Sequence, residues 1–128
     1  RVARIWSRTL ERVRAARLAP AFITVRAGTE GWIEMLPKVH AKRLHSDGTA
    51  ESYLVRLEPG ARAPAHGHPA GEECLVLEGA VRYVGADTLN AGDFQYAPAG
   101  AEHAELVSDT GALVFLRYAR PVTEYINL

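Results

Sequence analysis

The residues best suited to chemistry lie close together in the stretch 60–72, where two histidines precede a glutamate. Residues two apart on an extended strand point to the same face, so the imidazoles of His66 and His68 can aim at one point. Pro69-Ala70-Gly71 can then turn the chain and bring the carboxylate of Glu72 to that point. Two imidazole nitrogens and a carboxylate oxygen suit zinc, iron, nickel, manganese or copper at roughly 2.0–2.2 Å. A His-x-His pair alone is weak evidence, because such pairs are also common on surfaces.

A second stretch, residues 92–103, predicts a strand, a turn and a histidine that opens another strand. Together the two stretches resemble the two sequence motifs of the cupin superfamily. The matching patterns are Gly60-x5-His66-x-His68-x3-Glu72-x6-Gly79 and Gly92-x5-Pro98-x-Gly100-x2-His103, with twelve residues between them. The resemblance implies an all-β fold, a cupin jelly-roll β-barrel. It also implies one divalent metal ion bound by His66, His68, Glu72 and His103, with zinc expected and iron, nickel or manganese as alternatives.

One position departs from the cupin motifs, and one residue competes with Glu72 as the carboxylate ligand. The second cupin motif often ends with Asn four residues after its histidine, and Val107 stands there; that Asn is not a metal ligand, so the ligand set is unaffected. Glu73 is a rival carboxylate, since adjacent strand residues face opposite ways and only one of Glu72 and Glu73 can reach the metal. The motif spacing favours Glu72, which leaves Glu73 on the outer face as a candidate subunit contact.

Residues 21–120 also resemble the cupin domain of ChrR-type anti-sigma factors. The similar features are Trp32 before Leu36-Pro37, the run Tyr53 to Leu57 before Glu58-Pro59-Gly60, and His-Pro-x-Gly-Glu-Glu before Leu-Val-Leu-Glu-Gly. In that family the cupin is a C-terminal sensory module, which follows a zinc-binding helical module that sequesters a sigma factor. That helical module uses a Cys-x2-Cys pair, whereas Cys74 is the only cysteine here, so we expect the module to lie outside this chain in a longer parent protein.

The hydrophobic pattern divides the chain into an N-terminal helix, residues 1–20, and a barrel domain, residues 21–128. Residues 2–18 predict one basic amphipathic helix, whose apolar residues recur at helical spacing. With Arg1, six arginines crowd its remaining surface. After Pro20, short apolar runs alternate with Gly and Pro turns, which is typical of a sandwich or barrel. We expect strands near 32–36, 38–45, 51–57, 72–78, 80–84, 93–97, 104–107 and 112–119.

Composition excludes some functions. The net charge is zero, but residues 1–50 carry a net +6 and residues 51–128 a net −6, which argues against a uniformly basic nucleic-acid binder. We therefore expect the helix to pack its apolar stripe on protein and not to bind DNA.

No apolar run is long enough to span a membrane and no signal peptide opens the chain, so we expect a cytoplasmic protein. The poorly alternating run 113–116 predicts a homodimer.

Three further residues are candidates for a pocket beside the metal. Cys74 shares strand parity with Glu72 and is either a redox-active thiol or inert core. Phe94 and Tyr96 lie on one face of the strand before Pro98 and either shape the pocket mouth or pack in the core.

Three functions are compatible with the metal motif, and the sequence does not favour them equally. The ChrR resemblance favours a regulatory metal-binding domain with a sigma factor or an upstream anti-sigma module as partner. The alternative is an iron- or nickel-dependent dioxygenase of a small diketone or hydroxyketone, an enzyme type found among similar cupins. A metal-independent sugar-binding or epimerising jelly roll is disfavoured by the complete ligand set.

Overall fold

The computed structural model describes residues 21–119, whose regular secondary structure consists almost entirely of β-strands. The strands are β1 (Trp32–Leu36), β2 (Val39–Ser46), β3 (Glu51–Leu57), β4 (Ala61–Ala63), β5 (His66–Gly67), β6 (Glu72–Tyr83), β7 (Thr88–Asn90), β8 (Phe94–Ala97), β9 (Glu102–His103), β10 (Leu106–Ser108) and β11 (Ala112–Tyr118). The helix predicted for residues 2–18, and with it the domain 1–20, lies outside the described residues. No helix between residues 21 and 119 has the length and apolar character to cross a membrane.

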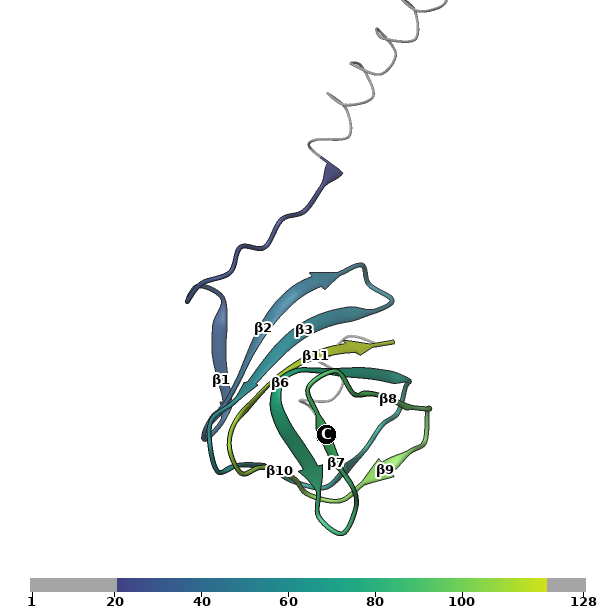
Figure 1. Cartoon of the computed structure of the whole chain (residues 1–128). Coiled ribbons are helices and arrows are strands. Elements are labelled where there is room, and N and C mark those ends of the chain that lie inside the picture. The colour runs from purple at the N-terminus through teal and green to yellow at the C-terminus, as the bar shows by residue number, and fades with distance from the viewer. Residues whose placement is uncertain (1–20, 120–128) are drawn as a thin grey trace, which may run out of the picture.

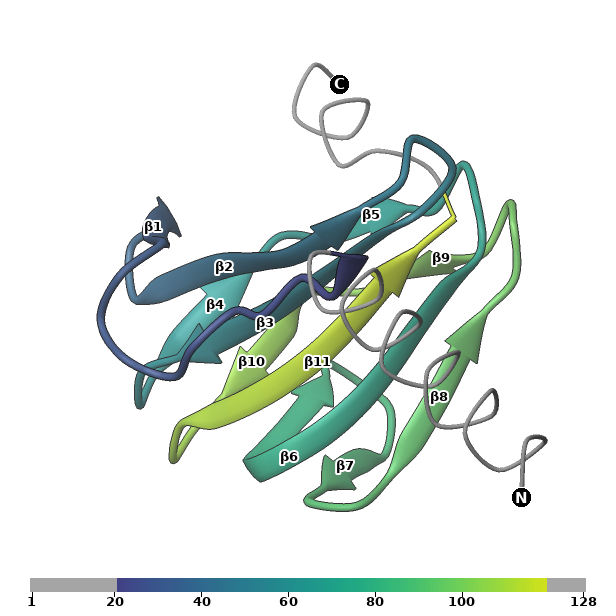
Figure 2. The same ribbon diagram turned by 90° about the horizontal axis from the view of Figure 1, so that it is seen from above.

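The strands form two sheets that share β6 and curve into a nearly closed barrel (Figures 1 and 2). In the larger sheet the neighbours run β1-β2-β3-β11-β6, and β8 pairs with the other edge of β6. In the smaller sheet β10 lies between β6 and β4, and β7 also pairs with β6. All these pairs are antiparallel, and β5 and β9 form a separate short pair. The prediction of an all-β barrel is confirmed.

Strand alternation places the core inside the barrel. On the central strands the residues that point inward are small and branched, and they are almost fully buried; the core comprises Val39, Leu57, Ala61, Cys74, Val76, Val81, Ala112 and Val114. Branched side chains suit strands because their restricted χ1 angle costs little there. The residues between them, such as Leu75 and Phe115, point to the outer face of the larger sheet.

The prediction of two strands at 72–78 and 80–84 was wrong, because the structure has one continuous strand, β6. Its register against β11 shifts between Leu113 and Val114, which marks a bulge. Gly79 lies next to this bulge with φ of 69°. The strand therefore bends there and passes from the larger sheet into the smaller one. The strands β4 and β7 were not predicted, because three residues are too few to show alternation.

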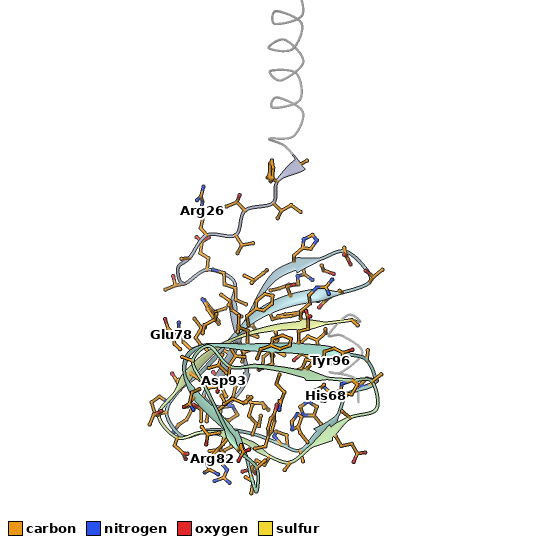
Figure 3. The ribbon with its side chains drawn as sticks, turned by 45° about the vertical axis from the view of Figure 1, so that its right-hand side comes forward. Arg26, His68, Glu78, Arg82, Asp93 and Tyr96 are labelled. Atoms are coloured by element: carbon orange, nitrogen blue, oxygen red, sulfur yellow. The ribbon has the colours of Figure 1, made fainter. Side chains whose placement is uncertain are left out.

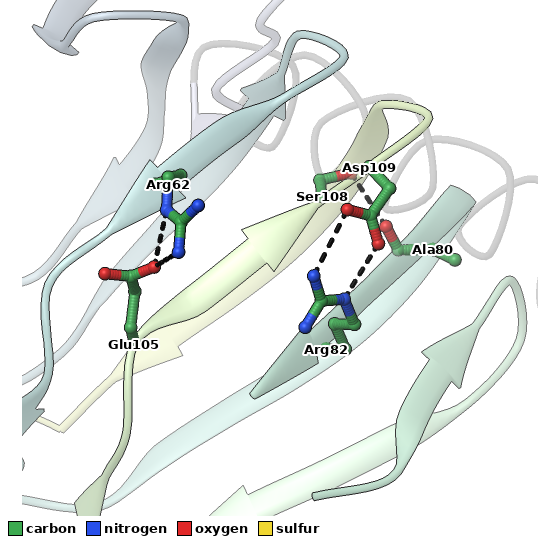
Figure 4. A network of polar contacts seen from close by, with 6 residues as sticks. All are labelled: Arg62, Ala80, Arg82, Glu105, Ser108 and Asp109. Atoms are coloured by element: carbon green, nitrogen blue, oxygen red, sulfur yellow. Dashed lines mark hydrogen bonds and ion pairs between the residues drawn. The ribbon is translucent and has the colours of Figure 1, made fainter. Parts of the chain in front are cut away.

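Polar contacts join the strands of the smaller sheet (Figure 4). The fully buried hydroxyl of Ser108 donates to the Ala80 carbonyl over 2.7 Å and ties β10 to β6. Arg82 donates to both carboxylate oxygens of Asp109 at 2.8 and 3.2 Å. Because Arg82 and Asp109 are exposed, this ion pair adds little stability, whereas the buried Ser108 bond is not exposed to competing water.

We expect Gly79→Ala to lower the free energy of unfolding by about 2–4 kcal/mol, because strained backbone and close contact with another chain segment both add to its cost. A Cβ at Gly79 would lie 2.0 Å from the Gly111 carbonyl oxygen. The matched control is Gly92→Ala, where φ is also positive but no atom lies within 4 Å of the new Cβ. The control should lose only about 1–2 kcal/mol. If urea denaturation showed equal losses of unfolding free energy in the two variants, the predicted clash would be contradicted.

Candidate metal centre

The first two histidines are placed by short extended segments at one end of the barrel. In the pair of β5 with β9, His66 lies directly opposite His103. His68 lies just beyond β5, and its backbone is fixed by two hydrogen bonds of 2.7 Å: its N–H donates to the Ala101 carbonyl, and its carbonyl accepts from Gly100. The Pro98-to-Ala101 turn of the second motif therefore determines where the first motif places its second histidine.

The three imidazoles converge. One nitrogen from each of His66, His68 and His103 lies within 4.8 Å of the others, and within residues 21–119 this is the group with a spacing suited to a metal ion. The Nε2 atoms of His66 and His103 are 3.3 Å apart. Ligands at roughly 2.0–2.2 Å from a tetrahedral or octahedral ion are about 2.8–3.6 Å from each other, so this separation fits two ligands of one ion.

The tautomers of two histidines favour a cation between them. Nδ1 of His66 lies 3.1 Å from the Pro64 carbonyl and Nδ1 of His103 lies 2.6 Å from the Ala104 carbonyl. A carbonyl only accepts hydrogen bonds, so each Nδ1 carries the proton and each Nε2 is left with a lone pair. Burial also lowers the pKa of His103 from its ordinary value. Two lone pairs facing each other repel, and a metal ion between them turns this repulsion into ligation.

Glu72 lies against the third histidine. Its Oε2 is 2.8 Å from Nδ1 of His68, and the side chains of His68 and Glu72 are only 3% and 10% exposed. The two atoms lack hydrogen-bond geometry, and neither has another hydrogen-bond partner among the described residues. Buried polar atoms without partners are costly, so a ligand at this point would be stabilising. The donor set therefore fits a divalent ion, with Glu72 either bound to it directly or holding His68 in orientation.

A pocket of about 350 Å³ opens beside the histidines and is lined by both His68 and His103 (Figure 3 shows His68 and Tyr96). Tyr96 also lines this pocket and is 57% exposed. Phe94 is 58% exposed and is not among the lining residues. Tyr96 is therefore among the residues that line the pocket and Phe94 is not, although both pair with outer-face residues of β6, Glu73 and Leu75.

Cys74 lies in the barrel core and is 7% exposed. Burial, with a smaller contribution from the negative charge of Glu72, raises the pKa of its thiol to about 12. The thiolate is the reactive form, so this environment favours inert core over a redox-active thiol.

Sequence reasoning missed Tyr83, which also lines the pocket. Its ring centroid is 4.7 Å from that of His103, and burial raises the pKa of its hydroxyl above the ordinary value. Tyr83 lies two residues after the buried Val81 on the same strand. That alternation was the signal that could have found it.

Comparison with known families agrees with the fold. The family model described as the ChrR cupin-like domain matches residues 20–122, so the chain belongs to this family of cupins. No curated protein matches the chain.

Solved structures show the same barrel. An acetylacetone dioxygenase from Acinetobacter johnsonii has a TM-score of 0.68 at 14% identity, over 77% of this chain and 74% of that chain. An RmlC-like cupin from Shewanella frigidimarina has a TM-score of 0.69 at 18% identity, over 81% and 96%. At these identities the likeness concerns the fold alone. A chain in the Rhodobacter sphaeroides structure of SigE with the anti-sigma ChrR is 28% identical, with a TM-score of 0.64. The match covers 73% of this chain and 50% of that one.

We expect the wild-type protein to purify with close to one divalent metal ion per chain, and His66→Ala with His68→Ala to abolish this binding. The remaining donors are too few to hold a borderline ion. The matched control is His40→Ala with His45→Ala, which removes two histidines of strand β2 outside the cluster. Elemental analysis should find the metal in the control and none in the site variant. Metal retained by the site variant would refute the assignment.

A second pair of variants tests the two neighbouring carboxylates. Glu72→Gln should weaken metal binding about 10–100-fold, the usual effect of losing a ligand's carboxylate partner, or more if Glu72 is itself a ligand. Glu73→Gln should leave the affinity unchanged, because Glu73 points away from the cluster. Competition with a chromogenic chelator measures the metal affinity of both variants. If Glu73→Gln lost more metal affinity than Glu72→Gln, Glu73 and not Glu72 would be the carboxylate at the site.

Proposed function

We propose that this protein is a metal-binding sensory domain of a ChrR-like anti-sigma factor, with one divalent ion held by His66, His68, His103 and Glu72. Zinc is the expected ion; iron, nickel and manganese also suit imidazole and carboxylate donors. The observation that carries the proposal is the pair of Nε2 atoms 3.3 Å apart, together with a buried Glu72 oxygen that has no hydrogen-bond partner among the described residues. Membership of the ChrR cupin-like family supports the regulatory role.

The chain's own residues determine what such a site can do. The Pro64 and Ala104 carbonyls lie beside Nδ1 of His66 and His103, an orientation that leaves Nε2 of each ring to bind a metal. Tyr83 packs its ring against His103, and the turn at Gly100 and Ala101 fixes His68. A bound ion would act as a Lewis acid and accept a small oxygen or nitrogen donor from the adjacent pocket. Such a ligand would alter the contacts of β9 and of the loop after β5.

The partner in this proposal is a sigma factor or an upstream anti-sigma module. The ChrR neighbour was solved in complex with SigE, and this chain matches half of the length of the chain it resembles. We therefore place the sigma-binding part in a longer parent protein. Since a sigma factor acts on RNA polymerase, the proposed compartment is the cytoplasm. The barrel itself does not bind DNA in this proposal.

An iron- or nickel-dependent dioxygenase is the second candidate, and the pocket beside His68 and His103 favours it. Three histidines and one carboxylate can leave coordination positions free for substrate and O2. The likeness to an acetylacetone dioxygenase supports this reading only through the shared barrel.

A paired experiment separates the two functions. Protein loaded with Fe(II) or Ni(II) should consume no O2 above the metal-free control when pentane-2,4-dione is added, because the proposed site senses and does not turn over. Chromosomal His66→Ala with His68→Ala in the source organism should change transcription of one defined set of promoters. His40→Ala with His45→Ala is the control for both. Steady O2 consumption with unchanged transcription would favour the enzyme.

We also propose that two copies form a homodimer. Strand β11 lies between β3 and β6, and it places half-buried apolar residues such as Phe115 on the outer face of the larger sheet. Covering this face with a second copy removes apolar surface from water. Sedimentation velocity at tens of micromolar should give a dimer, and a monomer at that concentration would contradict the proposal.

A further inference from the structure

The segment that leads into the barrel carries apolar side chains that the barrel does not cover. Phe22 is 74% exposed, Ile23 is 72% exposed and Val25 is 42% exposed. We call residues 21–26 the arm. Figure 1 shows the arm standing away from the strands, and Figure 3 labels Arg26 on it. Fully burying side chains of this size is worth roughly 1.5–3 kcal/mol each, so a surface that covers them is strongly favoured.

The root of the arm is held in place by its own barrel. Lys42 is only 5% exposed, and its Nζ donates to the Arg26 carbonyl over 2.7 Å. Close by, Nε1 of Trp32 donates to the Gly28 carbonyl over 2.9 Å. These bonds anchor residues 26–28 against strands β1 and β2. The arm therefore leaves the barrel in a fixed direction.

The arm needs cover on two sides. It runs as an elongated trace in Figure 1, and neighbouring residues of an extended chain point to opposite sides. Phe22 then faces one way, and Ile23 with Val25 the other. A segment with apolar side chains on both sides fits between two packed surfaces and not on the solvent side of one sheet.

The outer face of the larger sheet offers a matching surface at β6, β8 and β11. Leu75 is paired with both Phe94 and Phe115, so these three side chains share one face. On the same strands Leu77 is 42% exposed and Phe94 is 58% exposed. This cluster lies on strands other than those that anchor the arm, and it is the exposed part of the outer face.

The charges on this face are balanced. Arg117 is paired directly across from Glu73, and NH1 of Arg56 lies 3.8 Å from the Glu78 carboxylate. Two copies of the face therefore meet without net repulsion, and each arginine can find a glutamate on the opposite copy.

We propose that the arm of each copy crosses to the second copy and packs on its outer face around Leu75, Leu77 and Phe94. The inference rests on the homodimer proposed above and states how its interface is built. Each chain has one arm and one such face, so a two-fold axis lets both arms be covered at once. The exchange gives a cover to apolar side chains that the arm's own barrel leaves exposed.

Site-specific cross-linking tests the exchange. We would mix a chain carrying Ile23→Cys with a chain carrying Leu77→Cys and add a short bismaleimide. Native Cys74 is buried and adds little background. The expected product is a covalent pair containing one chain of each kind. The matched control replaces Leu77→Cys with Asp87→Cys, an exposed residue in the turn after β6, and should give none. A chain with Ile23→Cys and Leu77→Cys together that links only to itself would show that the arm folds back. That result, or no link at all, overturns the exchange.

Arm variants in the full chain give an independent result. Phe22→Asp with Ile23→Asp should raise the dimer dissociation constant at least about tenfold, because each dimer loses four apolar contacts. Phe22→Leu with Ile23→Leu is the matched control and should change it little. Metal content should stay at the wild-type value in both, since the arm is remote from the histidines. An unchanged dimer dissociation constant in the Asp variant overturns the arm exchange but not the proposed homodimer. A wild-type protein that is monomeric refutes both proposals.

Discussion

The candidate metal centre depends on a buried contact between two polar side chains. His68 and Glu72 are nearly enclosed, 2.8 Å apart, in a barrel whose core cluster is made of small apolar residues. Burying such groups is costly unless a cation or a proton compensates them. The remaining geometry of the site serves this constraint. The turn at Gly100 and Ala101 fixes the backbone of His68, and the opposite strand β9 supplies His103.

This arrangement connects parts of the chain that are distant in sequence. His66 and His68 precede β6, Glu72 begins it, and His103 belongs to β9. An ion bound to all of them would close the open end of the barrel with coordinate bonds. Because the unfolded chain has no such preformed site, metal binding would stabilise the folded state, and metal loss would loosen β5 and β9 before the core.

The sequence predicted the fold through turn residues and alternation, and it predicted the site through motif spacing. It failed where the outcome depends on how distant segments of the chain come together in the barrel. Gly79 was read as the end of a strand, but its positive φ lets one strand bend into two sheets. Tyr83 lacked a motif, so its position beside His103 emerged only when the barrel closed. Phe94 and Tyr96 share a strand face, yet only Tyr96 is among the lining residues, because alternation alone does not tell where along β8 the pocket lies.

The position of β11 has a consequence for the order in which the protein can be made. This last strand lies between β3 and β6, and no other strand joins the β1-β2-β3 group to β6 in the larger sheet. During synthesis the first three strands can form a hairpin-connected ribbon, but the barrel cannot close until residues 112–118 have left the ribosome. Pairing of such distant segments is slow, because a long loop must be ordered first. The nascent chain therefore exposes the edges of β3 and β6 that pair with β11 from the time each is made until β11 emerges, which makes this stage the one at which a chaperone would be most useful.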